Sequence, residues 1–578
     1  MRGSLPAGQA GKDQSNLVLC FEKRDCFTAF AMTSVITMWF IIMLSLSLSV
    51  QAQDIPPTTS LVYPGTDGKL VYVKDSLGNK IPDFSNAGYK GGGVAIPYVP
   101  VKETVWPVPG NNSDHVQAAI DRISALPMDD SGFRGAVLLK MGTYLLEKPI
   151  YIKATGVVIR GEGMSDVGTI LIGRLPKENQ GPAFRRPALI NVGGDSGTRP
   201  LEETKQLITD KYVPVGAASF TVASAKNFKK GDMVLVRRIG NSDWIKAIGQ
   251  DTLSVGRHRW VPFTISYDRI IVDVKGNTIT LDAPIFTAIE SRWGGGEIVK
   301  YTDERIEQVG IENLRGVSEY DPSVRTKAYG NMDRGNFDDP NIRYEGEEYF
   351  SDENHYFNFI NISNARNVWV RNMSALHFGS SVVQSNAGTK WITVQDCESR
   401  EPVSIRMGAR RFTFQVNGQL SLVQRCFSQK GRHSFVLQGS ESSGNVFFDC
   451  TAVNAYSTSE PHNRWANGSL YDNVKAPLTA RFWKDISIGW AGANIVFWNC
   501  EGDFLIQSPP TAKNYSFGHI GIHAVIFNTV LQDLTKPRGF IESLDKHVAP
   551  RSLYLTQLKE RLGEAALKNI AKGAGGLE

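Results

Sequence analysis

The sequence predicts an all-β fold, a parallel β-helix with an N-terminal capping helix, an inserted small antiparallel β-module and a C-terminal helix. The main observation is a repeat. Six short β-branched and aromatic runs, such as "WITVQDC" and "NVFFDC", have endpoints that differ by 24, 29, 24, 24 and 26 residues. A near-constant period in the twenties without helical spacing indicates a solenoid with one coil per repeat. The endpoints are Met373, Cys397, Cys426, Cys450, Val474 and Cys500.

Leucine-rich repeats have a similar period, but the repeated Leu-x-x-Leu-x-Leu frame that they need is missing, which favours the β-helix. Equivalent residues then stack about 4.8 Å apart. The endpoints are apolar throughout, as an inward-facing ladder requires. We predict that its four cysteines are buried thiols rather than disulfides, because one ladder accounts for all four. The preceding positions form a mostly Asn/Asp column typical of a turn: Asn372, Asp396, Arg425, Asp449, Asn473 and Asn499.

The N-terminal part predicts a cap for the solenoid. "SDHVQAAIDRISAL", from Ser113, has an N-cap residue before apolar positions at helical spacing. The short glycine-punctuated strands "GAVLLKMGTYLL" and "GVVIRGEG" follow it. An amphipathic helix at this place would cover the open end of the coil.

This order of helix and strands, followed by rungs such as "VGIENL" at 309, resembles the pectate-lyase-like superfamily of right-handed parallel β-helices. The resemblance covers most of residues 106–530 and implies a single-stranded, right-handed coil. It is specific for the fold and weak for the reaction, since the superfamily includes polysaccharide lyases, glycoside hydrolases, epimerases and phage tailspikes.

Two segments depart from the rung pattern. Residues 212–290 alternate apolar and polar residues around Gly-Asn turns, which predicts the inserted antiparallel module. "SLYLTQLKERLGEAALKNI", from Ser552, has helical periodicity and predicts a closing helix. The expected parts are an N-terminal extension plus signal peptide (1–52), an arm (53–105), the cap and first rungs (106–211), the module (212–290), the rungs (291–530) and a C-terminal helical segment (531–578).

The stretch from Met32 to Ala52 has an apolar core that ends in small residues, which indicates a secretory signal cleaved near Ala52. The alternative is an uncleaved membrane anchor, and the translation start is open between Met1 and Met32. We expect a secreted, periplasmic or cell-surface monomer without stable membrane insertion after cleavage. The net charge of +5 on 63.7 kDa argues against a dedicated nucleic-acid binder.

Stacking also predicts a polar strip along the solenoid. Residues 396–484 contain eleven Lys or Arg against seven Asp or Glu, which suits an anionic polysaccharide. Four positions past the ladder lie His377, Glu401, Lys430 and Asn454. About 12 to 14 positions past it lie Arg410, Arg411, Gln438, His462 and Arg464.

For a uronate polymer the matching reaction is β-elimination, which requires carboxylate neutralisation, a base and an acid. We predict His433 or His462 as the base and Lys430 or Tyr471 as the acid, with His377 as a further candidate. In the structural alternative His433 caps a turn, Lys430 pairs with Glu401 across rungs, and His377 has a similar role. Substrate-binding candidates are Arg410, Arg432, Arg464, Trp465, Glu401, Glu353 and His355.

Trp465 belongs to "EPHNRW", residues 460–465, which we expect to leave the coil and expose the indole to a sugar ring. No cofactor is expected to be required. Ca²⁺ is possible, because residues 338–355 are rich in acids, although no EF-hand spacing occurs there.

Two other functions stay open. A β-helix glycoside hydrolase needs two carboxylates about 5 to 9.5 Å apart. Its candidates are Glu353, Glu401, Glu460, Asp472 and Asp485. A non-catalytic glycan-binding or adhesion protein could use the same basic, aromatic strip.

Overall fold

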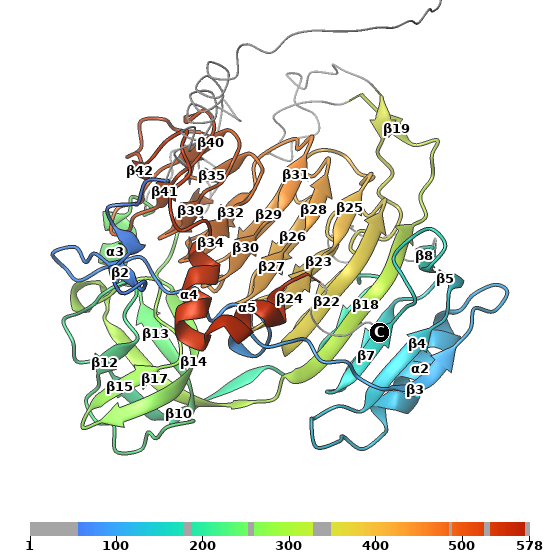
Figure 1. The fold of residues 1–578 in the computed structure, drawn as a ribbon, viewed down its shortest axis with the longest axis horizontal. Helices are drawn as coiled ribbons and strands as arrows, with labels where there is room; N and C mark the ends of the chain where they lie inside the picture. Colours follow the sequence, from blue (N-terminus) through green and yellow to red (C-terminus); the bar gives the residue numbers. More distant parts are fainter. Residues whose placement is uncertain are drawn as a thin grey trace, which may run out of the picture. The chain divides into compact units, whose positions relative to one another are not determined.

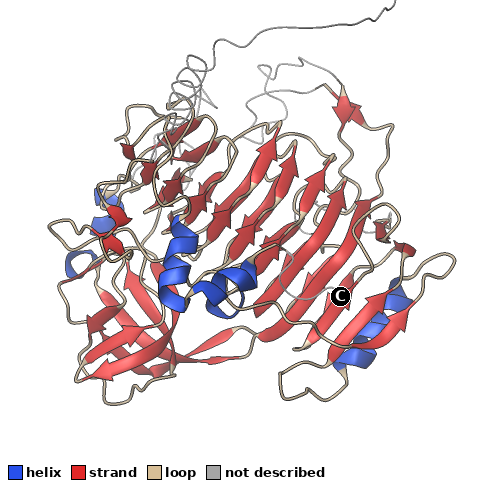
Figure 2. Ribbon diagram, in the orientation of Figure 1, coloured by secondary structure: helices blue, strands red, loops and turns tan. Residues whose placement is uncertain are grey.

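The computed structural model describes residues 56–578, apart from 177–185, 252–258, 328–347, 485–487, 525–531 and 573–578. The expected N-terminal extension and signal peptide (1–52) lie outside the described residues. Strands dominate the chain (Figures 1 and 2). No helix within the described ranges is long and apolar enough to cross a membrane.

The body is a right-handed parallel β-helix, which confirms the predicted fold class. Each central coil contributes one strand to each of three parallel runs, because its β-branched and aromatic segments favour a pleated conformation. The first run is β3 (Val101–Val105), β4 (Gly135–Leu139), β7 (Val157–Arg160), β18 (Ile306–Ser318), β22 (Ala365–Leu376), β24 (Thr393–Gln395), β27 (Leu422–Gln424), β30 (Val446–Phe448), β34 (Leu470–Asp472), β39 (Val496–Trp498), β41 (Tyr515–Phe517) and β42 (Phe540–Glu542).

The second run is continuous with the first through the long strands β18 and β22. It contains β5 (Gly142–Leu146), β8 (Thr169–Gly173), β25 (Glu398–Arg400), β28 (Phe427–Gln429) and β31 (Thr451–Val453). The third run is β6 (Ile150–Ile152), β9 (Ile190–Val192), β21 (Ile360–Ile362), β23 (Val383–Ser385), β26 (Phe412–Val416), β29 (His433–Gln438) and β32 (Glu460–Asn463). A bridge from Ser459 to Leu478 extends it to β35 (Leu478–Ala480) and β40 (Phe504–Ile506).

Two corners of the coil need a left-handed backbone. The predicted Asn/Asp column has φ between 49° and 55° at all six positions, a conformation that Asn and Asp tolerate better than most residues. The column of His377, Glu401, Lys430 and Asn454 also has positive φ, between 49° and 69°. The predicted register therefore holds, and both columns are structural turns.

The inward ladder is confirmed. Met373, Val474 and the four cysteines are at most 2% exposed, and the cysteines are unpaired. Aromatic rings stack next to them across successive coils, with centroid distances of 5.7 Å for Phe414 and Phe435 and 4.8 Å for Phe447 and Tyr471.

The cap and the closing helices also appear where the sequence predicts them. Helix α2 (Ser113–Ser124) buries Val116, Ala119, Ile120 and Ile123 against the end of the coil. Helices α4 (Leu553–Leu562) and α5 (Glu564–Ile570) lie across the first run (Figure 1). One boundary differs, because β42 adds a rung at 540–542 within the segment predicted to be helical.

The antiparallel module is larger than predicted. Its sheet has the order β10 (Thr198–Leu207), β17 (Gly296–Asp303), β13 (Met233–Ile239), β14 (Thr264–Lys275), β15 (Thr278–Leu281) and β12 (Ser219–Thr221). It thus spans 198–303 instead of 212–290. The two added strands pair with each other, Thr198 opposite Asp303, so no local turn signal marks them. Helix α3 (Ser242–Ala247) and the pair β11 (Tyr212–Val213) and β16 (Ile289–Glu290) complete the module.

A buried ion network attaches the module to the coil. The Asp268 carboxylate in β14 lies 2.9 Å from Lys390 Nζ and 2.8 Å from Arg305 Nη2, and it accepts a 2.7 Å hydrogen bond from Tyr301 Oη. All four residues are buried. Because charges without a partner are costly to bury, this network fixes where the module sits.

Smaller elements connect these parts. They are β1 (Val62–Pro64), β2 (Leu70–Tyr72), β19 (Arg325–Thr326), β20 (Tyr349–Phe350), β33 (Ala466–Asn467), β36 (Phe482–Trp483), β37 (Gly489–Trp490), β38 (Gly492–Ala493) and the 3₁₀ turns Tyr89–Gly91 and Ser291–Trp293.

Asp472 joins α4 to the coil, and its Oδ2 accepts hydrogen bonds from Ser552 Oγ and the Tyr554 amide, both at 2.8 Å. Burial raises the pKa of Asp472 from 3.8 to about 7. Between these values the folded state binds more protons than the unfolded state, so this carboxyl makes stability fall as pH rises from about 4 to about 7.

We therefore expect Asp472→Asn, which cannot ionise, to gain stability relative to the wild type as pH rises from 5 to 8, by about 2.5 kcal/mol. Urea unfolding of both proteins at each pH measures this difference. An identical pH dependence in the two proteins would contradict the assignment.

Candidate functional site

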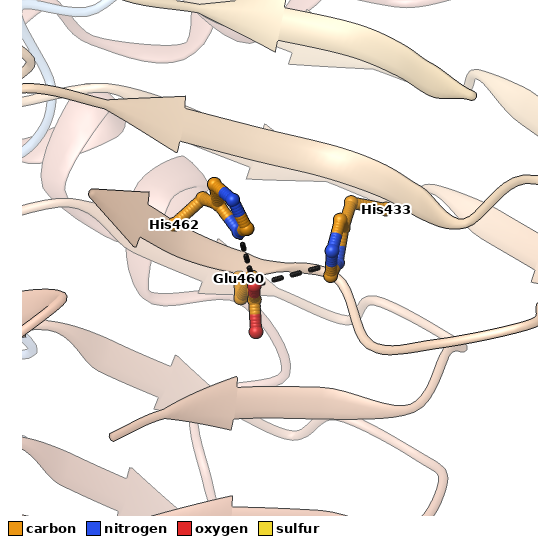
Figure 3. Close-up of side chains that lie close together, drawn as sticks. All are labelled: His433, Glu460 and His462. Atoms are coloured by element: carbon orange, nitrogen blue, oxygen red, sulfur yellow. Dashed lines mark hydrogen bonds and ion pairs between the residues drawn. The ribbon is translucent and has the colours of Figure 1, made fainter. Parts of the chain in front are cut away.

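Three side chains from adjacent strands of the third run lie close together (Figure 3). His433 begins β29, and Glu460 and His462 belong to β32, which pairs with β29 in parallel. Their possible ligand atoms all lie within 4.8 Å of one another. In Figure 3 the two imidazole rings flank the Glu460 carboxylate.

The Glu460 carboxylate is fully buried and accepts several hydrogen bonds. Oε1 accepts from His462 Nδ1 at 2.6 Å. Oε2 accepts from Thr458 Oγ1 at 2.8 Å, from Thr479 Oγ1 at 2.6 Å and from Arg481 Nη2. Burial would raise the pKa of Glu460, but Arg481 and the two histidines outweigh it and hold the pKa well below its usual value. The group is therefore a permanent anion at neutral pH.

His433 is the enclosed member of the pair. Its Nδ1 donates to the Thr458 carbonyl oxygen at 2.6 Å, because that oxygen can only accept. Nδ1 also lies 3.4 Å from Glu460 Oε1, whereas Nε2 is buried and has no hydrogen-bond partner among the described residues. Burial lowers the pKa of His433 well below 6.5, so the ring is neutral. We infer that it positions the carboxylate and does not meet a substrate.

His462 differs because its side chain remains 15% exposed. Donation from Nδ1 to Glu460 leaves Nε2 as the basic nitrogen of the neutral ring. Burial lowers the pKa of His462, and the bond to Glu460 opposes that effect. The carboxylate thus orients the ring and stabilises the imidazolium that forms when Nε2 takes a proton.

Aromatic rings and arginines enclose the cluster. The Phe412 ring lies edge-on to both imidazoles, with centroid distances of 5.0 Å to each. The Arg481 guanidinium lies 3.3 Å from the Trp483 ring centroid. Burial lowers the pKa of Arg432 to about 10, so it remains a cation beside Glu460. The site therefore combines one anion with two buried cations.

Two imidazoles and a carboxylate are also a possible ligand set for a transition metal. In this arrangement both Nδ1 atoms point at oxygen acceptors and Arg481 occupies Glu460 Oε2, so the rings have only their Nε2 atoms left as ligands. Ca²⁺ prefers oxygen ligands, so two imidazoles do not suit it. The hydrogen-bonded cluster fits proton transfer better than metal binding.

Two of the predicted residues lie elsewhere than expected. Trp465 is fully buried and packs on Trp244 of the module at a centroid distance of 5.0 Å, so it offers no face to a sugar. Tyr471 faces the interior, where Oη donates to the Phe435 carbonyl at 3.2 Å, so it is not available as an acid.

The expected excursion at 460–465 is also wrong. Its first four residues form β32, and a register shift opposite Leu437 and Gln438 is followed by a left-handed corner at Arg464 and Trp465. Arg464 itself is exposed.

The remaining candidates divide between corners and ion pairs. Glu401 faces His377 at 3.6 Å rather than Lys430, which is exposed. Arg410 and Glu353 form a bidentate pair at 2.9 and 2.8 Å, so each neutralises the other.

His355 does not reach the surface as predicted. It is fully buried, with Nδ1 2.7 Å from Ser318 Oγ and Nε2 3.0 Å from the Val403 carbonyl oxygen.

Arg481, Thr458 and Thr479 are the site residues that the sequence reasoning missed. The alternation Thr458, Glu460, His462 is a strand pattern with polar side chains on one face, and it was available in "TSEPH". Arg481 lies 21 residues after Glu460, about one coil later, so the repeat could have placed it beside that carboxylate.

Comparisons with known proteins give fold neighbours only. No family model matches the sequence, and no curated protein matches it. Among solved structures, the pectate lyase Pel9A is 8% identical over 81% of this chain and 84% of its own, with a TM-score of 0.36.

The exopolygalacturonase from Thermotoga maritima is 10% identical over 78% and 82% of the two chains (TM-score 0.30). The tailspike gp61 of Pseudomonas phage phi297 is 11% identical over 71% and 68% (TM-score 0.28). These neighbours are right-handed parallel β-helix proteins of the pectate-lyase-like superfamily. The strand register of this chain shows a parallel β-helix independently of them.

We expect Glu460→Gln to lower the free energy of unfolding by about 3 to 5 kcal/mol, because Arg481 loses its buried counter-charge. The pKa of His462 should fall as well, because Glu460 raises it in the wild type. Urea unfolding and NMR titration of the imidazole measure the two effects.

Glu319→Gln is the matched control, because it breaks an exposed pair with Arg174 and should cost no more than about 1 kcal/mol. Equal losses of unfolding free energy in the two variants would show that the Glu460 cluster stabilises the protein no more than an exposed ion pair does.

Proposed function

We propose that the protein is a carbohydrate-active enzyme that cleaves an anionic, uronate-containing polysaccharide by β-elimination, with His462 as the base. The observation that carries the proposal is the 2.6 Å bond from His462 Nδ1 to buried Glu460 on a ring that stays partly exposed. A histidine fixed in one tautomer by a carboxylate is suited to proton abstraction.

In the proposed reaction His462 Nε2 takes the proton beside the uronate carboxylate. The electron pair of that C–H bond forms the new double bond, and the bond to the leaving oxygen breaks. A cation must neutralise the carboxylate, since the charge that builds up on it opposes proton removal. Exposed Arg464, two residues beyond His462, is our candidate for this role, and exposed Lys430 is the candidate that protonates the leaving oxygen.

The hydrolase alternative has less support. It needs two available carboxylates. Three of the candidate carboxylates are already engaged within the protein. Glu460 accepts hydrogen bonds from Arg481 and two threonines, Asp472 accepts them from the start of α4, and Glu353 pairs with Arg410. Glu401 is exposed, and Asp485 lies outside the described residues.

We also propose that the protein acts outside the cytoplasm, as a monomer, on a polysaccharide rather than a nucleic acid. This proposal rests on the predicted signal sequence and the mild net charge. Fold likeness to a tailspike, a pectate lyase and an exopolygalacturonase adds no argument for substrate or location.

The test is incubation of the protein with a panel of uronate-containing and neutral glycans. We expect UV-absorbing unsaturated ends from a uronate polymer, and a loss of at least about 100-fold in kcat with His462→Ala, the usual range for a general base. His115→Ala, an exposed histidine on α2, is the matched control and should keep full activity.

New reducing ends without unsaturation would establish the hydrolase instead. Binding without cleavage would establish the adhesion-type function. Full activity of His462→Ala in a lyase would remove the assignment of the base.

A further inference from the structure

We propose that Arg406, held between Tyr349 and Tyr456, is a carboxylate-binding subsite for the polysaccharide. The guanidinium carbon lies 3.7 Å from the Tyr349 ring centroid and 4.0 Å from that of Tyr456. The three residues come from β20, the connection between β25 and β26, and the segment before β32. Residues distant in sequence thus converge to hold one side chain.

The two tyrosine rings contact the guanidinium through cation–π interactions only. They leave its hydrogen-bond donors without acceptors. Within the described ranges the Arg406 guanidinium has no hydrogen-bond acceptor and no counter-ion, and its Nε is buried and unpartnered. A donor without an acceptor is unfavourable, so an external acceptor would be favoured.

Neighbouring arginines do not share this condition. Arg410 pairs with Glu353, Arg411 donates to the Ser404 and Lys430 carbonyl oxygens, and Arg432 donates to the Gly408 carbonyl oxygen. Those bonds hold in place the loop between β25 and β26, which carries Arg406. Arg406 is partly exposed on the same loop, and its Nη atoms, unlike Nε, are not among the buried unpartnered atoms, so they can meet a ligand.

The positive charge of two neighbouring arginines also favours the binding of an anion. The Arg411 guanidinium lies 5.7 and 5.5 Å from the same two rings, so two cations share one pair of tyrosines. Burial lowers the pKa of Arg411 to about 10, and the Arg406 charge acts in the same direction. An anion bound by Arg406 would relieve this repulsion.

The shape of the donor group identifies the chemistry. A planar guanidinium fork matches a carboxylate through two parallel hydrogen bonds. Contact with two tyrosine rings restricts the Arg406 side chain before a ligand binds, which removes rotamer freedom that binding would otherwise have to remove. A uronate carboxylate is therefore the expected ligand.

The subsite is connected to the His462 cluster by two hydrogen bonds to backbone carbonyl oxygens. Arg432, next to His433, donates to the Gly408 carbonyl oxygen on the Arg406 loop, and the Tyr456 amide donates to the Gly431 carbonyl oxygen at 2.8 Å. A polymer that places one sugar at His462 could place another uronate at Arg406. The identity of the ligand thus rests on the proposed function, whereas anion binding by Arg406 does not.

The experiment measures binding of a galacturonate oligosaccharide by calorimetry in the His462→Ala background, where the proposed turnover is absent. We expect Arg406→Gln to weaken binding at least 10-fold and Arg406→Lys, which keeps the charge and loses the fork, to weaken it several-fold. Arg174→Gln, an exposed arginine paired with Glu319, is the control and should bind as before.

A neutral oligosaccharide of equal length should bind the parent and Arg406→Gln equally. Unchanged galacturonate binding in both Arg406 variants would overturn the subsite. Tighter, Arg406-dependent binding of a sulfated oligosaccharide would overturn the carboxylate assignment. If Arg406→Gln does not fold, by its circular dichroism spectrum, Arg406→Lys decides the question alone.

Failure of the proposed function gives a different pattern. Arg406-dependent uronate binding by a protein that cleaves no glycan would remove the lyase and keep the subsite. Lyase activity with the same kcat and KM in Arg406→Gln would keep the lyase and remove the subsite.

Discussion

Everything in this protein depends on coils of nearly equal length stacking in register. The parallel strands hold each residue beside its counterpart one coil away, and two left-handed corners keep the register constant. Polar residues at equivalent outward positions therefore become neighbours without any long-range search. Thr458 and Glu460 meet Thr479 and Arg481 in this way. The scaffold thus assembles a charged cluster simply by repeating.

The same constraint explains how far the sequence could be read. The period located the cysteine ladder and the Asn/Asp corner, because both recur at every coil. It located His433 and His462 but misjudged their exposure, since burial depends on Phe412 and Trp483 from other coils. Trp465 was misplaced because the module covers it, and β10 and β17 were missed because they pair across about a hundred residues. A sequence shows the two-residue alternation of strands and the repeat of about 24 residues per coil. It does not show contacts that follow neither pattern.

Burial gives the two histidines of the cluster unequal roles. Both contact the Glu460 carboxylate, but only His462 keeps an exposed edge, so the anion can orient one ring for proton transfer while the other closes the site from water. The anion itself remains charged only because Arg481 and two threonines replace its hydration. Catalytic competence would therefore be inseparable from local stability, and this is why substitutions of Glu460 should affect both.

A second apolar core shows which face of the coil is left for a ligand. Outward residues of the first run, including Leu422, Val446, Leu470 and Val496, pack with the module, the N-terminal arm and the closing helices. That face is dry and filled, so it cannot bind a soluble polymer. The surroundings of β29 and β32 differ, because arginines, tyrosines and the partly exposed His462 imidazole gather there. Because apolar cover and ligand access exclude each other on one surface, the module and the helices leave the third run as the face for the recognition that we propose. His462 and Arg406, the proposed base and the proposed subsite, lie on that side of the coil.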